Sequence, residues 1–204
     1  MSYISIRMST LRGDQKIDFN AYIKINDKMV LYLKKGDSFE GVRLQRLKDK
    51  KLRKMYIENE EENKYLTYLQ RNIDSAYDLT TTKDMQTRVE IIQGAQQGNV
   101  EEVFENADNA ESYNKTKEDA GKYVQFILNN TDAVGALMNV ENTDKSIAHH
   151  GVTVSTLAVS LAKKLKITDE KKIQLLALGA LLHDFGHTIE PINLNLAVDK
   201  MPKE

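Results

Sequence analysis

Residues 149–187 read HHGVTVSTLAVSLAKKLKITDEKKIQLLALGALLHDFGH, and this stretch decides the fold. In its first part, apolar residues recur at intervals of three and four, which is the period of one face of an α-helix. This face comprises Ile147, His150, Gly151, Val154, Leu157, Ala158, Leu161 and Leu165. We therefore expect His150 to point into the interior together with the aliphatic residues. His149 is about 100° further round the helix, and we expect a structural or surface role for it.

A second helix should follow after a short break. Thr168 is expected to be its N-cap, as Thr143 is for the helix before it, because a hydroxyl oxygen can accept a hydrogen bond from a free backbone N–H of the first turn. Residues 173–182, IQLLALGALL, are apolar almost all round, which is typical of a helix buried on every side. The helix ends at the polar pair His183 and Asp184.

A histidine and an aspartate at the end of a buried helix need partners, because unpaired polar groups in a protein interior cost stability. A bound cation would be such a partner. Imidazole and carboxylate suit iron, manganese, zinc and similar divalent ions, and a carboxylate can bridge two ions. Gly186 is expected to end the helix, which would leave the pair open to substrate. His150 alone would be read as an ordinary core histidine, but together with this pair it predicts the first part of a metal site.

Two motifs resemble the HD superfamily of metal-dependent phosphohydrolases. They are HGVTVSTLA at residues 150–158 and ALLHDFGH at residues 180–187. The resemblance extends over residues 117–204 and is strongest to the HD-GYP branch, whose members hydrolyse cyclic di-GMP. It implies an all-helical domain with a binuclear divalent metal centre, with iron or manganese as the expected ions.

The resemblance also implies roles for individual side chains. His150, His183 and Asp184 correspond to metal ligands, and Asp184 would bridge two ions. His187 stands where family members usually have a lysine that holds substrate phosphate; it is shorter and can be neutral near pH 7. Asp184 and His187 are therefore the expected catalytic residues. Ser146 occupies the position of a glutamate that binds a third metal in some members, so we expect at most two metals.

The family draws its remaining ligands and its Gly-Tyr-Pro signature from helices further downstream. This chain has four histidines, none of them after His187, and the sequence ends at Glu204. Three ligands are fewer than a two-metal centre needs. We therefore expect the chain to be truncated relative to its full-length relatives and not to be a competent hydrolase by itself.

Three functions are compatible with these features. The leading hypothesis is a cyclic di-GMP phosphodiesterase of the HD-GYP type, or the N-terminal portion of one, in which two ions clamp the scissile phosphate and activate a water. The alternative is a non-catalytic signalling and protein-interaction module, similar to HDOD proteins, that keeps the HD helices as a scaffold. The third is an HD hydrolase acting on another nucleotide. The expected partners are a cyclic dinucleotide, as substrate or ligand, and signalling proteins.

The composition narrows the class of protein. The chain has 204 residues, 41% of them hydrophobic, and a formal net charge of -1. This is typical of a globular protein and gives no general attraction to nucleic acid or to anionic membranes, so we expect neither as a partner. The sequence contains no stretch with the length and apolar character of a membrane span or signal peptide. With the absence of cysteine, this favours the cytoplasm, and the resemblance implies a bacterial protein.

The chain should fold as α+β, with a small N-terminal α/β module in residues 1–78 and the all-helical HD-type domain in residues 79–204. Alternating polar and apolar residues predict strands, and Asn26-Asp27 predicts the turn of a hairpin. The elements expected in the module are strands over 17–25, 29–33 and 54–57, a short helix with a capping-box pattern at Asp37 and Glu40, and a helix over 60–77.

From residue 83 onward the pattern is helical, and it leaves open whether the first helix continues past Gly98 or a new one begins there. Tyr65 and Tyr68 are expected to be packing residues rather than a ligand platform. A basic run is expected to be a solvated helix end and loop rather than a nucleotide or partner surface, because acidic residues flank it. The run comprises Lys48, Lys50, Lys51, Arg53 and Lys54.

Overall fold

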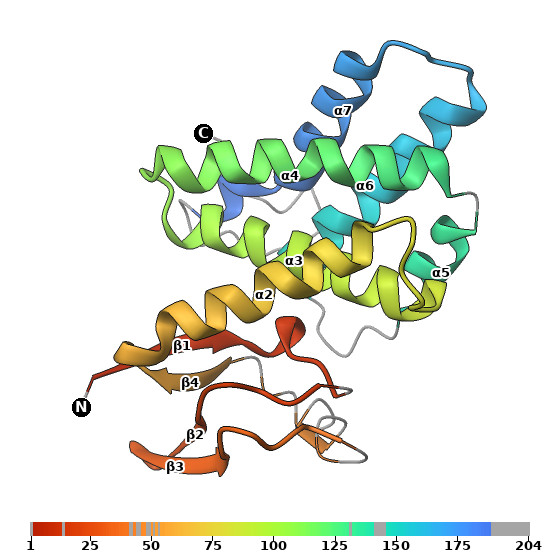
Figure 1. Cartoon of the computed structure of the whole chain (residues 1–204). Coiled ribbons are helices and arrows are strands. Elements are labelled where there is room, and N and C mark those ends of the chain that lie inside the picture. Colours follow the sequence, from red (N-terminus) through yellow and green to blue (C-terminus); the bar gives the residue numbers. More distant parts are fainter. Residues whose placement is uncertain are drawn as a thin grey trace.

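The computed structural model describes residues 2–13, 15–40, 43, 46–47, 50, 52, 54–130, 132–140 and 146–188. A small sheet, covered by one helix, lies next to a group of packed helices (Figure 1). The sheet comes first in the chain and the helical part second. This order confirms the predicted α+β fold, with a small N-terminal sheet followed by a helical part.

Four antiparallel strands form the sheet, in the order β1-β4-β2-β3. Their bounds are β1 Tyr3–Arg7, β2 Ala21–Ile25, β3 Lys28–Leu33 and β4 Lys54–Glu58. The predicted hairpin is formed by β2 and β3, and its turn residues Asn26 and Asp27 have φ of 46° and 61°, which these residue types tolerate. The sequence did not predict β1, and β2 is shorter than the expected strand because Ile17 and Phe19 are buried outside the ladder.

Part of the module falls outside the described residues. The helix expected to follow Asp37 and Glu40 lies largely there. Three members of the basic run, Lys48, Lys51 and Arg53, also lie there. Lys54 begins β4, and its ammonium group lies 2.8 Å from a carboxylate oxygen of Glu105.

The sheet is covered by α2 Glu62–Tyr77, which follows the short 3-10 helices η1 Met8–Thr10 and η2 Asn59–Glu61. Tyr65 and Tyr68 pack edge-on against Phe19 in the core between sheet and helix, so they are packing residues as predicted. Near the other end of α2, Ala76 is buried in the core of the helical part. Because α2 contributes to both cores, the boundary between residues 78 and 79 stays a prediction.

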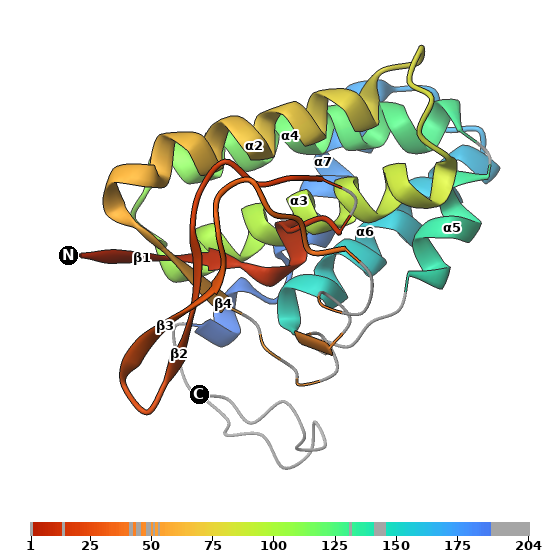
Figure 2. The same ribbon diagram turned by 60° about the horizontal axis from the view of Figure 1, so that its bottom comes forward.

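The helical part is built on a long central helix, α3, which lies between the sheet and α6 (Figure 2). It continues through Gly98 without a break, which decides the question that the sequence left open. The elements are α3 Met85–Glu105, α4 Ala110–Asn129, α5 Ala133–Asn139, α6 Ile147–Lys164, α7 Glu170–Leu182 and η3 Phe185–Thr188. None of the helices in the described part combines the length and the apolar character that crossing a bilayer requires.

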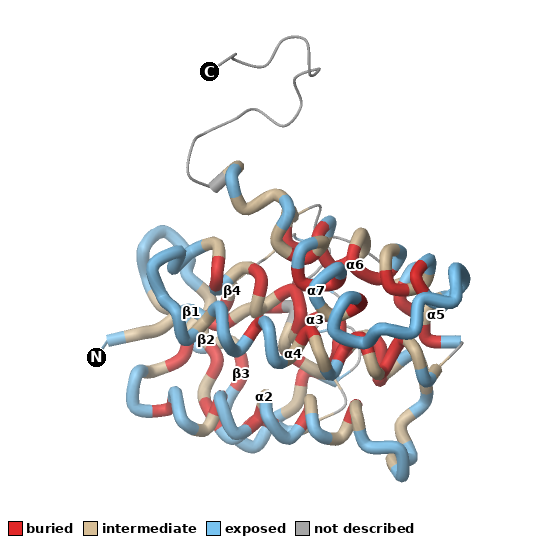
Figure 3. The backbone as a smooth tube through the Cα atoms, turned by 90° about the horizontal axis from the view of Figure 1, so that it is seen from above, coloured by how far each residue is buried: buried red, intermediate tan, exposed pale blue. Residues whose placement is uncertain are grey.

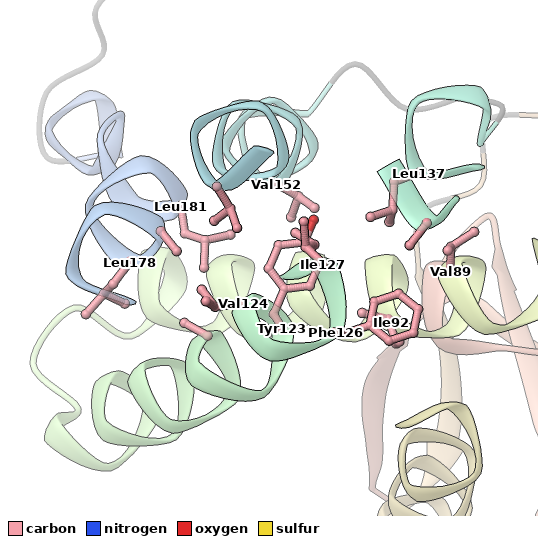
Figure 4. Close-up of a cluster of buried hydrophobic side chains, with 14 of the residues drawn as sticks. Val89, Ile92, Tyr123, Val124, Phe126, Ile127, Leu137, Val152, Leu178 and Leu181 are labelled. Atoms are coloured by element: carbon pink, nitrogen blue, oxygen red, sulfur yellow. The ribbon is translucent and has the colours of Figure 1, made fainter. Parts of the chain in front are cut away.

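The core of the helical part lies where α3, α4, α6 and α7 meet (Figure 4). Tyr123 of α4 is fully buried there, and its hydroxyl forms a hydrogen bond with the hydroxyl of Thr156 on α6. Burial raises the pKa of Tyr123. The polar atom of this large side chain is therefore satisfied inside the core, as a buried hydroxyl requires.

The buried face of α6 is not the one that the apolar spacing predicted. His150 lies on the exposed side, as do Leu157, Leu161 and Leu165, which are 50%, 58% and 65% exposed. The buried residues of this helix are mostly small, namely Ala148, Gly151, Val152, Ser155, Thr156, Val159 and Ala162. Small side chains let α6 approach its neighbours closely. The face that carries them is therefore buried, and the face with the larger leucines is exposed.

The prediction that α7 is buried on every side is wrong for the described residues. Leu175 and Leu176 are 71% and 44% exposed, whereas Leu178 and Leu181 face the core. The tube in Figure 3 shows exposed and buried segments alternating along this helix. An apolar helix is buried on every side only if other parts of the protein surround it. Here α6 and α4 cover one side of α7.

The helix ends also differ from the sequence prediction. Thr143 lies outside the described residues, and Ser146 is the N-cap of α6. Asp169, rather than Thr168, caps α7 by accepting a hydrogen bond from the backbone N–H of Lys172 at 3.2 Å. Gly186 does not end α7, because that helix stops at Leu182 and the glycine lies within η3.

Candidate metal centre

Three of the predicted site residues meet at one place. His150 comes from the first turns of α6, and His183 and Asp184 directly follow α7. Each can offer one ligand atom such that all three atoms lie within 4.8 Å of one another. Because α6 and α7 pack side by side in the described fold, residues about 33 positions apart converge.

Asp184 is the centre of the cluster. Its Oδ2 lies 3.3 Å from Nε2 of His183 and 3.7 Å from Nε2 of His150. Its Oδ1 lies 3.6 Å from Nε2 of His187, the remaining predicted site residue. The carboxylate is 21% exposed, and the His150 side chain, at 57%, is the most open of the four. The cluster thus lies at the surface, on one side of the helix pair.

A backbone contact fixes the proton on the His183 ring. Nδ1 of His183 lies 2.8 Å from the carbonyl oxygen of Ala180. A carbonyl oxygen can only accept a hydrogen bond, so Nδ1 must carry the hydrogen. In the neutral ring Nε2 then presents a lone pair, and it faces Oδ2 of Asp184. Two acceptors at this distance repel each other unless a proton or a metal ion lies between them, and a backbone bond to the far nitrogen is the usual arrangement of metal-bound histidines.

The donor set therefore fits a divalent ion. Two imidazole nitrogens and a carboxylate suit iron, manganese and zinc, which accept mixed nitrogen and oxygen ligands. The second oxygen of Asp184 points away from the two histidines toward His187. A carboxylate can in general bridge two ions, with one oxygen on each.

His187 lies in η3, beside the cluster. Its side chain is 23% exposed, and its Nδ1 is buried without a hydrogen-bond partner among the described residues. The structure brings His187 next to Asp184, and its contact with a substrate phosphate stays a prediction.

The first turn of α6 is held by side-chain contacts that could not be predicted from the sequence. Ser146 Oγ accepts a hydrogen bond from the backbone N–H of His149 at 3.2 Å. The His149 ring, for which a structural or surface role was expected, is half-buried, with Nδ1 3.2 Å from Nε2 of Gln93 and Nε2 3.3 Å from the hydroxyl of Thr153. Gln97 Nε2 lies 3.2 Å from Ser146 Oγ. Glutamines in a helix usually indicate a solvated face. Gln93 and Gln97 are therefore recognised as supports of α6 only from their tertiary contacts.

A second contact reaches the other ligand segment. Phe104, near the end of α3, packs against Phe185 with the ring centroids 5.6 Å apart. Phe185 directly follows Asp184 in the chain. α3 therefore contacts both segments that supply candidate ligands.

Comparisons with known proteins agree with this geometry. Residues 147–202 match the HD domain family, whereas no curated protein matches the chain. Among solved structures, the chain is similar to Bd1817, a HDG"Y"P protein from Bdellovibrio bacteriovorus, at 70% sequence identity and a TM-score of 0.87. The match covers 98% of this chain but 66% of that protein, so the chain spans just under two thirds of its relative. From the HD motif at the metal cluster and the similarity along almost its whole length, the chain belongs to the HD superfamily and is of the HD-GYP type.

Proposed function

We propose that this chain is part of a metal-dependent phosphodiesterase that hydrolyses cyclic di-GMP. One observation carries the proposal: ligand atoms of His150, His183 and Asp184 gather within 4.8 Å in a chain that is 70% identical to an HD-GYP-type protein. We expect the activity in the cytoplasm, in keeping with a chain that contains no cysteine.

The chemistry of the cluster supports phosphodiester hydrolysis. A pair of iron or manganese ions, when bound, stabilises charge on phosphate oxygens and lowers the pKa of water. The residues of this chain would hold and orient that pair. His150 and His183 would each bind one ion, and Asp184 would bridge both.

His187 has a separate role in the proposal. Its ring lies on the Oδ1 side of Asp184, at 3.6 Å, and is held in η3 close to the end of α7. A protonated ring there can donate to a phosphate oxygen, as the lysine usual at this position in the family does. His187 would thereby neutralise phosphate charge without binding metal.

The three candidate ligands are fewer than two ions require. We propose that the other donors come from the part of the full-length protein that corresponds to the remainder of the Bdellovibrio relative. This chain would then supply only some of the ligands of the metal centre, namely His150, His183 and Asp184. This is the sense in which we expect it to be no competent hydrolase by itself.

One observation favours the alternative of a non-catalytic protein-interaction module. Large apolar side chains are exposed on α6, on α7 and between them, and such patches commonly mark surfaces that other protein segments cover. They are Leu157, Leu161, Leu165, Ile167, Leu175 and Leu176. In this alternative the HD helices serve as a scaffold for a signalling partner.

Metal content and cyclic di-GMP chemistry distinguish the two functions. The chain is purified without oxygen after growth with iron or manganese, and the metal per chain is measured by elemental analysis. The His183→Ala/Asp184→Ala double variant is the test, and Asp169→Asn, which changes an acid at the opposite end of α7, is the matched control. Cyclic di-GMP binding and hydrolysis are then measured on the metal-loaded chain.

We expect metal in the wild-type chain and in the control, and its loss in the double variant. If the wild-type chain hydrolyses cyclic di-GMP and the double variant does not, this chain is itself an enzyme. Metal-dependent binding of cyclic di-GMP without hydrolysis would support the role as one part of the full-length enzyme. A chain that retains no metal and does not bind the dinucleotide would show that the chain is not itself an enzyme, and would leave a truncated hydrolase or a scaffold.

A further inference from the structure

A continuous series of polar contacts connects the sheet to the helix that carries His150. Arg7, the last residue of β1, donates from Nη1 to Oε2 of Glu101 at 2.5 Å. The other oxygen of Glu101 accepts from Nε2 of Gln97 at 3.2 Å. That same amide nitrogen lies 3.2 Å from Oγ of Ser146, the N-cap of α6. We call these four residues the Arg7–Ser146 relay.

At its inner end the relay joins the Gln97 amide nitrogen to the Ser146 side chain. The Gln97 amide nitrogen carries two hydrogens, one for Glu101 and one for Ser146. The Ser146 hydroxyl oxygen receives Gln97 and the backbone N–H of His149. The Ser146 carbonyl accepts from the N–H of His150 at 3.1 Å. The position of His150 is therefore tied to a side chain of α3.

The relay is shielded from water. Gln97 is 7% exposed, and the side chains of Arg7 and Glu101 are 15% and 21% exposed. Shielded charged contacts are stronger and less screened by salt than surface pairs. Glu102 and Glu105 lie 3.6 and 3.4 Å from the second Arg7 nitrogen and hold the guanidinium in place.

The outer end of the relay lies beside a cavity. Arg7 borders a groove of about 800 Å³ between β1, α2, α3 and α4. A shift of β1 would separate Arg7 from Glu101 and leave the carboxylate free to draw the Gln97 amide away from Ser146. The Ser146 side chain, which caps the first turn of α6, would then lose its contact with α3.

We propose that Gln97 is a positioning residue for the metal centre and that the Arg7–Ser146 relay transmits the position of the N-terminal sheet to His150. The sheet is thereby a regulatory element of the site. The part of this inference that concerns metal affinity rests on the proposed function. The part that concerns the first turn of α6 does not.

Three variants of the 204-residue chain test the relay, together with one control. They are Gln97→Met, Arg7→Met and the double variant, in which methionine keeps an unbranched side chain but removes the hydrogen-bond donors. The control is Arg12→Met, because Arg12 also joins the N-terminal module to α3, through Glu90 at 3.0 Å, but lies outside the relay. Binding of Mn²⁺ is measured by isothermal titration calorimetry.

We expect Gln97→Met to weaken Mn²⁺ binding about 10-fold, because it acts on His150 through Ser146 without touching a candidate ligand. Arg7→Met should weaken it about threefold, as a remote coupled site does. The double variant should bind no more weakly than Gln97→Met, since the relay is already broken. Arg12→Met should lower the melting temperature without changing the Mn²⁺ affinity.

Hydrogen exchange of the metal-free chain supplies a readout that does not depend on metal. Amides in residues 146–153 should exchange faster in Gln97→Met and Arg7→Met than in wild type, and at the wild-type rate in Arg12→Met. Equal exchange in all chains, or the same acceleration in Arg12→Met, would overturn the relay. If wild type binds no Mn²⁺ but the exchange pattern appears, the relay stands and this chain alone does not form the metal site.

Discussion

The carbonyl oxygen of Leu181 lies closer than van der Waals contact to the point where a Cβ atom on Gly151 would be. No real Cβ tolerates this distance, so the backbones of α6 and α7 can be this close only because Gly151 has no side chain. Gly151 follows His150, and Leu181 precedes His183 by two residues. The contact therefore sets the separation of the two histidine rings, whose centroids are 5.1 Å apart.

The first prediction concerns Gly151→Ala. The added methyl group must push α6 and α7 apart, which should lower the free energy of unfolding by about 1–3 kcal/mol, as overpacking does. It should also weaken Mn²⁺ binding about 10-fold, in line with misplaced ligands. Gly179→Ala is the matched control, because a Cβ there meets nothing within 4 Å. This control should be neutral or stabilising by up to about 1 kcal/mol. Equal effects in urea denaturation would contradict the packing argument.

The second prediction compares two leucines of α7. Leu181 is 1% exposed and Leu175 is 71% exposed. Leu181→Ala leaves a cavity and should lower the free energy of unfolding by about 2–5 kcal/mol. Leu175→Ala should change it by less than about 0.5 kcal/mol, because little contact is lost at the surface. Chemical denaturation of both variants measures the difference. A large loss with Leu175→Ala would mean that another copy of the chain covers this face.

These two helices also define what could be predicted from the sequence. The sequence predicted α6 and α7, their order and the convergence of His150 with His183 and Asp184, because the helical period and the HD motifs are local patterns. It did not predict which side of each helix is covered. Leu157 and Leu175 have the same local signal as buried leucines, and only the neighbouring helices decide their exposure.

The contacts that hold the ligand segments in place could not be predicted from the sequence, for a related reason. Gln97 meets Ser146 across 49 positions of sequence, and Phe104 meets Phe185 across 81. A buried glutamine has no local signature that separates it from a solvated one. β1 was missed although it has the same length as the predicted β4, and its place in the sheet is set by pairing with β4, which is distant in sequence.

The third prediction concerns acid stability. Asp84 caps α3, and the backbone N–H and hydroxyl of Thr87 both donate to its carboxylate, which lowers its pKa. The Asp84 carboxyl therefore binds a proton more readily in the unfolded chain than in the folded one. Its contribution to stability is present above the ordinary pKa of about 4 and is lost as pH falls through the lowered pKa. Asp84→Ala should lower the melting temperature at pH 7, with a smaller difference at pH 3. Asp132→Ala is the control, because Asp132 precedes α5 without a side-chain capping bond. A difference for Asp84→Ala that does not shrink in acid would contradict the capping role.

The last prediction separates metal binding from phosphate binding and rests on the proposed function. His187 lies beside Asp184 but outside the group of three whose ligand atoms gather within 4.8 Å. His187→Ala should therefore leave the metal content unchanged and weaken cyclic di-GMP binding about 10-fold, the loss of one hydrogen bond to a charged group. His187→Lys should retain the affinity, because an ammonium group can also reach and neutralise phosphate. Asp184→Ala should lose the metal itself. Elemental analysis and calorimetry on the same samples distinguish the two effects. Loss of metal in His187→Ala would make His187 a ligand, and unchanged affinity would remove it from the phosphate site.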